Sequence, residues 1–221
     1  MSPDKQTTGL IRTRADIEQG VSALRRKCQY IRHVHDTVGN PPLRRSRRGF
    51  PGLARIIVGQ QLSTASAKAI WSRVEAGITP MTPRQLLRVD DKGLAALGLS
   101  RPKIRSLRAL ANAVTSGDLN LGSNHHKMPE HQLRELLLQV SGIGPWSVDI
   151  YLLFCLGYRD AFAPGDLALQ IAVENIFELP ERPKPDELAA LAKRWSPWQG
   201  IAARLLWAYY ENQKNTATSL K

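Results

Sequence analysis

The chain has 221 residues and a formal net charge of +12 at pH 7, and its 43% hydrophobic content is enough to bury one large core or two small ones. An excess of Lys and Arg gains free energy by displacing counterions from phosphates, so a polyanionic partner is favoured over charge carried for solubility alone. The two cysteines, Cys28 and Cys155, exclude a disulfide framework and a four-cysteine iron–sulfur cluster. No run approaches the roughly 20 apolar residues of a membrane span, and the first ten residues hold no signal-peptide core, so we expect a cytoplasmic protein.

Helical periodicity governs the chain from residue 15 onward. Apolar residues recur at spacings of three and four over 15–39, and again over 50–77, where the segment Gly59–Ser63 predicts a break. Further helices are expected over 82–89, 91–98, 100–117, 129–140, 146–154, 165–177, 184–195 and 197–213. No run alternates apolar and polar residues as a half-buried strand would, so the predicted fold class is all-α.

Two polar segments interrupt this pattern. Residues 39–50 ("GNPPLRRSRRGF") combine prolines with arginines and are expected to form a surface connection between two helical units. Residues 124–132 ("NHHKMPEHQ") contain His125, His126 and His131. Because no Cys or carboxylate stands near them at the spacing that zinc sites use, we expect solvated loop histidines and no metal site.

The stretch 139–154 ("QVSGIGPWSVDIYLLF") places two glycines and a proline directly before an apolar helix. Gly142 and Gly144 permit positive φ and lack the Cβ atoms that would block a close approach, and Ile143 can turn inward to lock the turn. The free N–H groups at the start of the following helix would then point towards an anion, such as a DNA phosphate, without reading a base. An ordinary helix–helix corner with a glycine C-cap is the alternative.

Further stretches combine with this hairpin to resemble a known family. Residues 136–154 and 158–170 ("LLLQVSGIGPWSVDIYLLF…YRDAFAPGDLALQ") look like the helix-hairpin-helix signature and the Gly/Pro-rich loop ending in Asp of the helix-hairpin-helix DNA glycosylase superfamily. "IVGQQLS" at 57–63 resembles the loop that enters the DNA in the alkylation-repair branch, 3-methyladenine DNA glycosylase II, and "RWSPWQGIAARLLW" at 194–207 resembles its C-terminal helix. The resemblance covers roughly residues 50–210 and implies a two-lobed helical fold with a DNA-binding cleft between the lobes.

Asp166 follows "APG" and begins the predicted helix at 165–177. On its own it would be interpreted as a helix N-cap, where a carboxylate is stabilised as the anion. The resemblance instead implies that Asp166 is the catalytic carboxylate, facing the sugar of a nucleotide extruded from the duplex. Its charge would stabilise the positive charge that builds on deoxyribose as the N-glycosidic bond breaks.

Trp146 stands where the bifunctional glycosylase/lyases of the superfamily carry a Schiff-base lysine, so a monofunctional enzyme is implied. The resemblance also makes Trp146 and Trp207 the aromatic walls of the base pocket, because a cationic methylated purine stacks well on indole faces. Helix packing is the alternative for Trp195, Trp198 and Trp207, and Trp195 and Trp198 are assigned to the core.

Gln61 or Leu62 is the implied wedge that fills the gap left by the extruded base. The alternative makes Leu62 a core residue and Gln61 a surface residue. Lys103, with its neighbours on the predicted helix 100–117, and the arginines of the 39–50 segment are candidate phosphate contacts or merely a solvated face, and the sequence leaves both open.

The expected domains are a discontinuous helical lobe of residues 1–49 and 161–221 and a central lobe of residues 50–160, with the hairpin at about 132–154. Since the residues before Phe50 show helical periodicity, we expect no N-terminal β domain of the kind that some members of the branch carry. The expected function is a monofunctional glycosylase that removes alkylated purines such as 3-methyladenine and 7-methylguanine, acting as a monomer on damaged double-stranded DNA. It would need no cofactor, although the family hairpin can hold an alkali ion. The alternatives are hypoxanthine, ethenoadenine or an oxidised base as the lesion, or a DNA damage-binding protein without catalysis.

Overall fold

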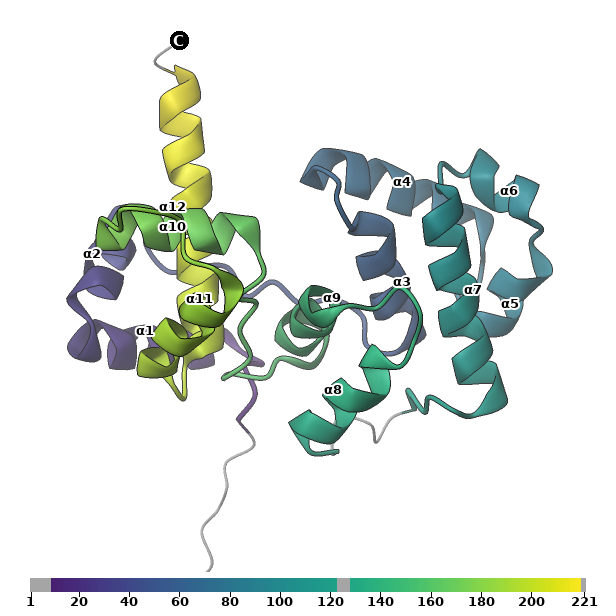
Figure 1. Cartoon of the computed structure of the whole chain (residues 1–221), viewed down its shortest axis with the longest axis horizontal. Coiled ribbons are helices and arrows are strands. Elements are labelled where there is room, and N and C mark those ends of the chain that lie inside the picture. The colour runs from purple at the N-terminus through teal and green to yellow at the C-terminus, as the bar shows by residue number, and fades with distance from the viewer. Residues whose placement is uncertain (1–8, 123–127, 220–221) are drawn as a thin grey trace, which may run out of the picture. The chain divides into compact units, whose positions relative to one another are not determined.

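The computed structural model describes residues 9–122 and 128–219 (Figure 1). Within these residues every regular element is a helix, and the one β-type pairing is an isolated antiparallel bridge between Leu10 and Tyr158. The predicted all-α class is therefore confirmed. Among the described helices, none has the length and apolar character needed to cross a bilayer.

The chain divides into two compact units, one made of Met1–Arg45 with Leu152–Lys221 and the other of Ser46–Tyr151. Both boundaries fall somewhat earlier in the chain than the expected ones at 49 and 160. The second boundary lies inside the apolar segment that follows the hairpin, so one continuous segment runs from the central unit into the discontinuous one.

In the central unit α3 is buried along most of its length and packs against α4, α7 and α9. Its elements are α3 (Phe50–Gly59), α4 (Thr64–Gly77), α5 (Pro83–Arg88), α6 (Asp91–Ala96), α7 (Arg101–Ser116), α8 (Glu130–Leu138) and α9 (Pro145–Ile150). Side-chain oxygens of Ser63, Thr82 and Asp90 cap the starts of α4, α5 and α6, as expected of residues that compete for backbone N–H groups. The break predicted at 59–63 is confirmed, because α3 ends at Gly59 and α4 begins at Thr64.

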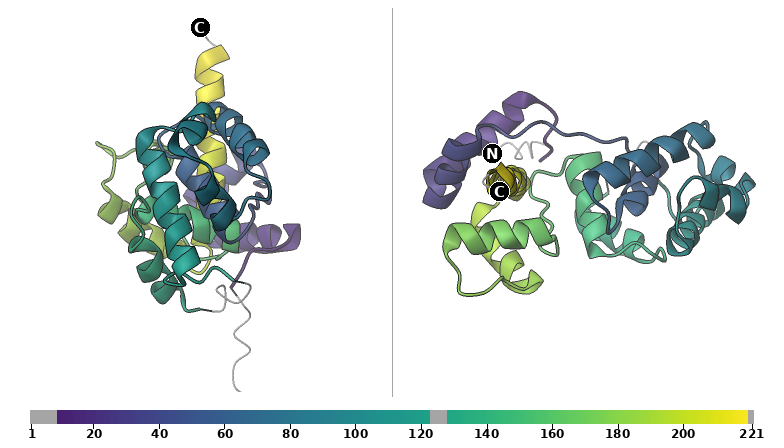
Figure 2. Two further views of the ribbon diagram at one scale, coloured as in Figure 1. Left: turned by 90° about the vertical axis from the view of Figure 1, so that its right-hand side faces the viewer. Right: turned by 90° about the horizontal axis from the view of Figure 1, so that it is seen from above.

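The discontinuous unit is assembled around α12. Its elements are α1 (Arg14–Lys27), α2 (Gln29–Val38), α10 (Leu167–Phe177), α11 (Pro185–Ala192), a 3-10 turn η3 (Lys193–Trp195) and α12 (Gln199–Ser219). Seen end-on, α12 has α1 and α2 on one side and α10 on the other (Figure 2). Gly20 makes the approach of α1 possible, since a Cβ there would lie 2.6 Å from Ile201 Cγ1 and 2.7 Å from the Trp198 ring.

The helix predicted over 15–39 is two helices. Cys28 adopts an extended conformation (φ −142°, ψ 114°) and separates α1 from α2. The Arg32 guanidinium donates from Nε and Nη2 to the Arg25 carbonyl, at 3.1 and 3.0 Å, so a carbonyl at the end of α1 keeps a partner. Apolar periodicity continues through the break, which explains why the sequence pattern did not reveal it.

The helix predicted over 146–154 also differs from the structure. After α9 the chain widens into a π-helical turn, η2 (Tyr151–Leu156), and the N–H groups of Gly157 and Tyr158 both bond the Leu152 carbonyl, at 2.8 and 2.9 Å. Gly157 has φ +84°, and a Cβ there would lie 2.6 Å from the Ile11 carbonyl oxygen, so this exit from the helix requires glycine. The shift of register leaves the Leu153 carbonyl to a side chain, Arg204, whose Nη2 lies 2.9 Å away.

Candidate active site and hairpin

Asp166 is both the N-cap of α10 and the hydrogen-bond partner of a tryptophan. Its Oδ1 accepts from the backbone N–H groups of Ala168 and Leu169, at 3.1 and 3.2 Å, and from the Trp207 indole N–H at 2.9 Å. The capping interpretation is therefore correct, and it does not compete with a catalytic one. Three N–H donors fix the carboxylate in place at the N-terminus of α10.

Trp207, on α12, differs from Trp195 and Trp198, which precede this helix, because its indole N–H bonds the Asp166 carboxylate. It is half-buried, and its ring centroid lies 5.4 Å from that of Phe154 in η2. Trp195 is fully buried between Phe162 and Phe177, so its assignment to the core is confirmed. Trp198 is only half-buried, and the guanidinium carbon of Arg159 lies 5.1 Å from the centre of its ring.

The two glycines of the hairpin play different parts. Gly142 has φ +88°, and a Cβ there would overlap the Ser106 hydroxyl, so the fold itself requires glycine. Gly144 has φ −98°, which any residue adopts, and a Cβ there would meet nothing within 4 Å. Ile143 is buried, so only its backbone is available to a ligand. Trp146, on α9, is half-buried.

The loop between α3 and α4 presents Gln61 and Leu62 to solvent. Gln61 has φ +55°, an uncommon conformation for a residue with a side chain, and Leu62 is 38% exposed. The alternative that Leu62 is a core residue is therefore wrong. The preceding residue, Gln60, was not singled out in the sequence, yet its Nε2 donates to the Gly142 carbonyl at 3.0 Å and to Ser147 Oγ at 2.9 Å. This amide fixes the loop to the hairpin.

Lys103 is used inside the central unit. Its Nζ donates to the Val58 carbonyl at 2.6 Å near the end of α3, and burial lowers the pKa of its ammonium. It therefore supports the start of the loop that carries Gln61 and Leu62. Whether it also reaches a phosphate stays a prediction.

The hairpin and the Asp166 loop both lie in a segment that matches one protein family. The sequence matches the description "HhH-GPD superfamily base excision DNA repair protein" over residues 54–197, a span that takes in the hairpin and Asp166. The chain belongs to the HhH-GPD superfamily.

Relatives within the HhH-GPD superfamily carry names that refer to alkylated bases. The chain is 30% identical to "DNA-3-methyladenine glycosylase 1" of Schizosaccharomyces pombe over 177 residues, covering 77% of each protein. It is 28% identical to "Alkylbase DNA glycosidase-like protein mag2" of the same organism over 162 residues, 72% of this chain and 76% of the relative. The solved structure of S. pombe 3-methyladenine DNA glycosylase (Mag1) in complex with abasic DNA superposes with a TM-score of 0.80 at 27% identity, over 86% of this chain and 95% of that one.

A buried ion pair beneath the HhH-GPD hairpin was not anticipated from the sequence. Arg134 on α8 donates from Nη1 to Asp149 Oδ1 on α9 at 2.6 Å, and from Nη2 to Glu130 at 3.2 Å. Burial raises the pKa of Asp149 to about 6, even though Arg134 pulls it the other way. Above that pH the ionised pair joins the two helices of the hairpin motif. The sequence shows an Asp inside an apolar helix, which indicates a buried carboxylate but does not identify Arg134 as its partner.

Metal binding finds no support in the part of the chain that is described. No group of three His, Cys, Asp or Glu side chains gathers there, and His131 is exposed, while His125 and His126 lie outside the described residues. The hairpin carbonyls of Val140, Gly142 and Gly144 already accept hydrogen bonds from Ile143, Gln60 and Val148. An alkali ion would have to use their second lone pairs, and it stays a prediction.

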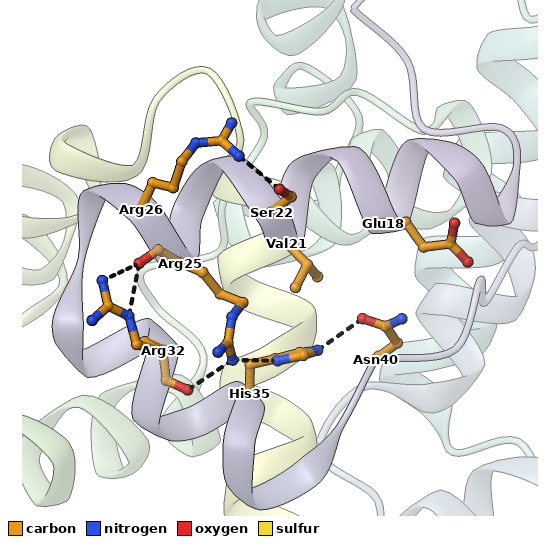
Figure 3. Close-up of a pocket in the computed structure, with 8 residues that line it drawn as sticks. All are labelled: Glu18, Val21, Ser22, Arg25, Arg26, Arg32, His35 and Asn40. Atoms are coloured by element: carbon orange, nitrogen blue, oxygen red, sulfur yellow. Dashed lines mark hydrogen bonds between the residues drawn. The ribbon is translucent and has the colours of Figure 1, made fainter.

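A recess of about 380 Å³ between α1 and α2 is distinct from the surroundings of Asp166 (Figure 3). Its cationic side chains serve the fold: Arg25 pairs with Asp36 and donates to His35 Nδ1 at 2.7 Å. Since arginine has only donors, His35 Nδ1 must accept, and its Nε2–H donates to Asn40 Oδ1 at 2.9 Å. The polar side chains around the recess therefore form a hydrogen-bonded network with a structural role.

Proposed function

We propose that this HhH-GPD protein is a monofunctional DNA glycosylase that hydrolyses the N-glycosidic bond of alkylated purines in double-stranded DNA and leaves an abasic site. The observation that carries the proposal is the hydrogen bond from Trp207 to Asp166, which joins a carboxylate and a stacking ring into one unit. The names of the relatives, and the abasic DNA bound to Mag1, support the choice of reaction and substrate.

The chemistry asked of Asp166 is electrostatic. As the bond between C1′ and the base nitrogen breaks, positive charge develops on the deoxyribose, and a fixed carboxylate stabilises that charge without reorganising. The electron pair leaves with the base, and water supplies the oxygen that ends on C1′. Because a purine alkylated at N3 or N7 is cationic before it leaves, the enzyme needs little acid catalysis on the base. The three N–H donors hold Asp166 in position for this role.

The monofunctional outcome rests on residue 146. A lyase that works through a Schiff base needs an amine to form the covalent bond to C1′, and the indole of Trp146 has no such nucleophile. We therefore expect the free base and an intact abasic strand as the products. A strand break that accumulates together with base release would contradict this part of the proposal.

Two glycines that the fold does not demand lie where the proposal needs DNA to approach. Gly144 is the N-cap of α9 and Gly165 precedes Asp166, and a Cβ at either one would meet nothing within 4 Å. Open space at both positions fits a ligand that comes close to the backbone: a phosphate at the hairpin and the nucleotide sugar beside Asp166. Gln61 and Leu62, exposed on their loop, are proposed to fill the gap in the base stack.

The deciding experiment is a base-release assay on methylated duplex DNA with wild type, Asp166→Asn and Asp186→Asn. Asp186 is an exposed acid in the first turn of α11, so it is a matched control. We expect wild type and Asp186→Asn to release 3-methyladenine or 7-methylguanine, and Asp166→Asn to lose about 10²-fold or more in rate while still binding DNA. If Asp166→Asn still released the base at the wild-type rate, the catalytic role assigned to the Asp166 carboxylate would be wrong. DNA binding by wild type without release of any base would leave a damage-binding protein.

A further inference from the structure

Arg204 is a buried cation whose hydrogen-bonding capacity is only partly used. It lies one helical turn before Trp207 on α12, and 5% of the residue is exposed. Its Nη2 bonds the Leu153 carbonyl, and its guanidinium carbon stacks 4.4 Å from the centre of the Phe154 ring. Within the described residues Nε and Nη1 have no hydrogen-bond partner. Buried polar groups of folded proteins nearly always have partners, so these two donors need an explanation.

Among the described residues, Arg204 has no counter-ion. No carboxylate of the described residues forms an ion pair with it, and another cation, Arg44, acts on it electrostatically. Burial, together with Arg44, lowers the pKa of Arg204 to about 10, so the side chain remains protonated at neutral pH. A protonated guanidinium has only donors to offer. Whatever completes this site must therefore accept hydrogen bonds.

The cavity beside Arg204 is connected to Asp166 through Trp207, which contacts both. Arg204 lines a cavity of about 20 Å³ together with Pro42, Arg44, Phe154, Trp207 and Ala208. That volume suits a single oxygen atom, since one water needs roughly 10–15 Å³ on the same measure. Trp207 lines the cavity and donates its indole N–H to Asp166. A base stacked on Trp207 would therefore bring its exocyclic substituent within reach of the cavity.

We infer that Arg204 is a specificity-determining residue that donates a hydrogen bond, from Nε or from Nη1, to the oxygen at C6 of an extruded purine. The site then favours 6-oxo purines, such as 7-methylguanine and hypoxanthine, over 6-amino purines such as 3-methyladenine. A 6-oxo group is an acceptor, whereas a 6-amino group presents N–H donors that would face the guanidinium donors. Sites that bind a substrate through buried polar groups reject analogues that leave those groups unpaired. The inference rests on the proposed function, because it uses Trp207 as the surface on which the base stacks.

The first test compares two cationic bases released from the same methylated DNA, 7-methylguanine and 3-methyladenine. In Arg204→Met, which keeps an unbranched apolar stem and removes the donors, we expect the ratio of 7-methylguanine to 3-methyladenine release to fall about tenfold. Arg204→Lys keeps one compact donor group, so its release ratio should lie between those of wild type and Arg204→Met. Arg26→Met, which removes an exposed arginine of α1 that donates to Ser22 Oγ at 2.8 Å, should keep the wild-type ratio. The ratio is internally controlled, because a variant that is merely less stable loses both activities together.

Several outcomes would overturn the inference. An unchanged ratio in active Arg204→Met would show that the cavity is filled by water for structural reasons alone. An equal fall in both activities, with weaker binding to undamaged DNA, would mean that Arg204 contacts a phosphate.

A binding measurement separates this inference from the proposed function. In the Asp166→Asn background, a duplex containing hypoxanthine should bind more tightly than the same duplex containing adenine, and Arg204→Met should abolish that difference. If wild type released no base, the proposed function would fail, and this comparison would still decide the role of Arg204. Equal affinity for the two duplexes would overturn it.

Discussion

Asp149 and Arg134 form a charge pair of the central unit in which the carboxylate is buried. Asp149 is 3% exposed and sits on α9 directly under the hairpin, so its carboxylate depends on the Arg134 guanidinium 2.6 Å away. A buried ion pair contributes little net stability, but removing one partner leaves an uncompensated charge. The pair therefore acts as a constraint on the geometry between α8 and α9 more than as a source of stability.

Arg134→Met should destabilise the protein by about 3 kcal/mol at pH 8, the lower end of the usual range because the Arg134 side chain is still 31% exposed. The folded pKa of Asp149, about 6, lies above its ordinary value of 3.8, so its contribution to stability is complete below pH 4 and is lost as pH rises through 6. Without Arg134 that pKa rises further. The cost of the substitution should consequently be smaller at pH 5, where the carboxyl is protonated, and urea unfolding at both pH values measures it.

Arg47→Met is the matched control for Arg134→Met. Arg47 pairs with Glu75 at 3.0 Å, but the two side chains are 71% and 41% exposed, so its loss should cost less than about 1 kcal/mol at either pH. An Arg134→Met variant whose cost is the same at pH 5 and pH 8 would show that Asp149 does not titrate in this range.

The hairpin is the element where fold and function demand glycine for different reasons. Gly142→Ala places a methyl group at φ +88° against Ser106, and we expect it to destabilise the central unit by about 1–3 kcal/mol. Gly144→Ala meets no atom and keeps an allowed conformation, so thermal unfolding should shift little. If the Gly144 backbone meets a phosphate, however, Gly144→Ala should weaken DNA binding severalfold, which an anisotropy titration would detect.

The two hairpin variants test each other. Gly144→Ala with unchanged stability and unchanged DNA affinity would reduce the hairpin to a turn between α8 and α9. Gly142→Ala with unchanged stability would show that the Ser106 side chain can move aside at no cost.

Helices were predictable from this sequence because apolar spacing records which face of a helix is buried. The all-α class, the break between α3 and α4, and the burial of Trp195 follow from that signal. The π-helical turn at Tyr151–Leu156 does not, because a shift from i+4 to i+5 bonding barely alters apolar spacing over a single turn. The glycine that follows this turn, Gly157, lies against the Ile11 carbonyl, which belongs to a segment far away in the chain.

The candidate site shows the same division between local pattern and distant pairing. Resemblance pointed to Asp166 and Trp207, which the structure joins by a hydrogen bond. Gln60, Arg204 and the partner of Asp149 were missed, because each is defined by a polar contact across long sequence separations. A sequence shows that a polar residue stands on an apolar helix, but only a fold shows what it meets.

At the scale of the whole molecule, the net charge of +12 is the property that no single contact explains. Several of the cations are used inside the fold: Lys103 on a carbonyl, Arg134 on Asp149 and Arg25 on Asp36. The remaining excess on the surface is what a DNA backbone would meet. Its contribution to affinity should therefore depend strongly on ionic strength and little on the identity of the damaged base.

Binding to a duplex with a stable lesion should weaken linearly on a log–log plot of affinity against salt, by about 0.9 per phosphate neutralised. For a protein that covers one lesion, we expect a slope of roughly −3 to −6 between 50 and 300 mM salt. Asp166→Asn suits this measurement, because it should bind without consuming the substrate. Arg204→Met should leave the slope unchanged if the guanidinium meets a base oxygen, whereas a slope reduced by about one would place it on a phosphate. A flat response in all variants would contradict the polyanion partner that the charge of the chain predicts, and the proposed reaction on duplex DNA would then lose its electrostatic basis.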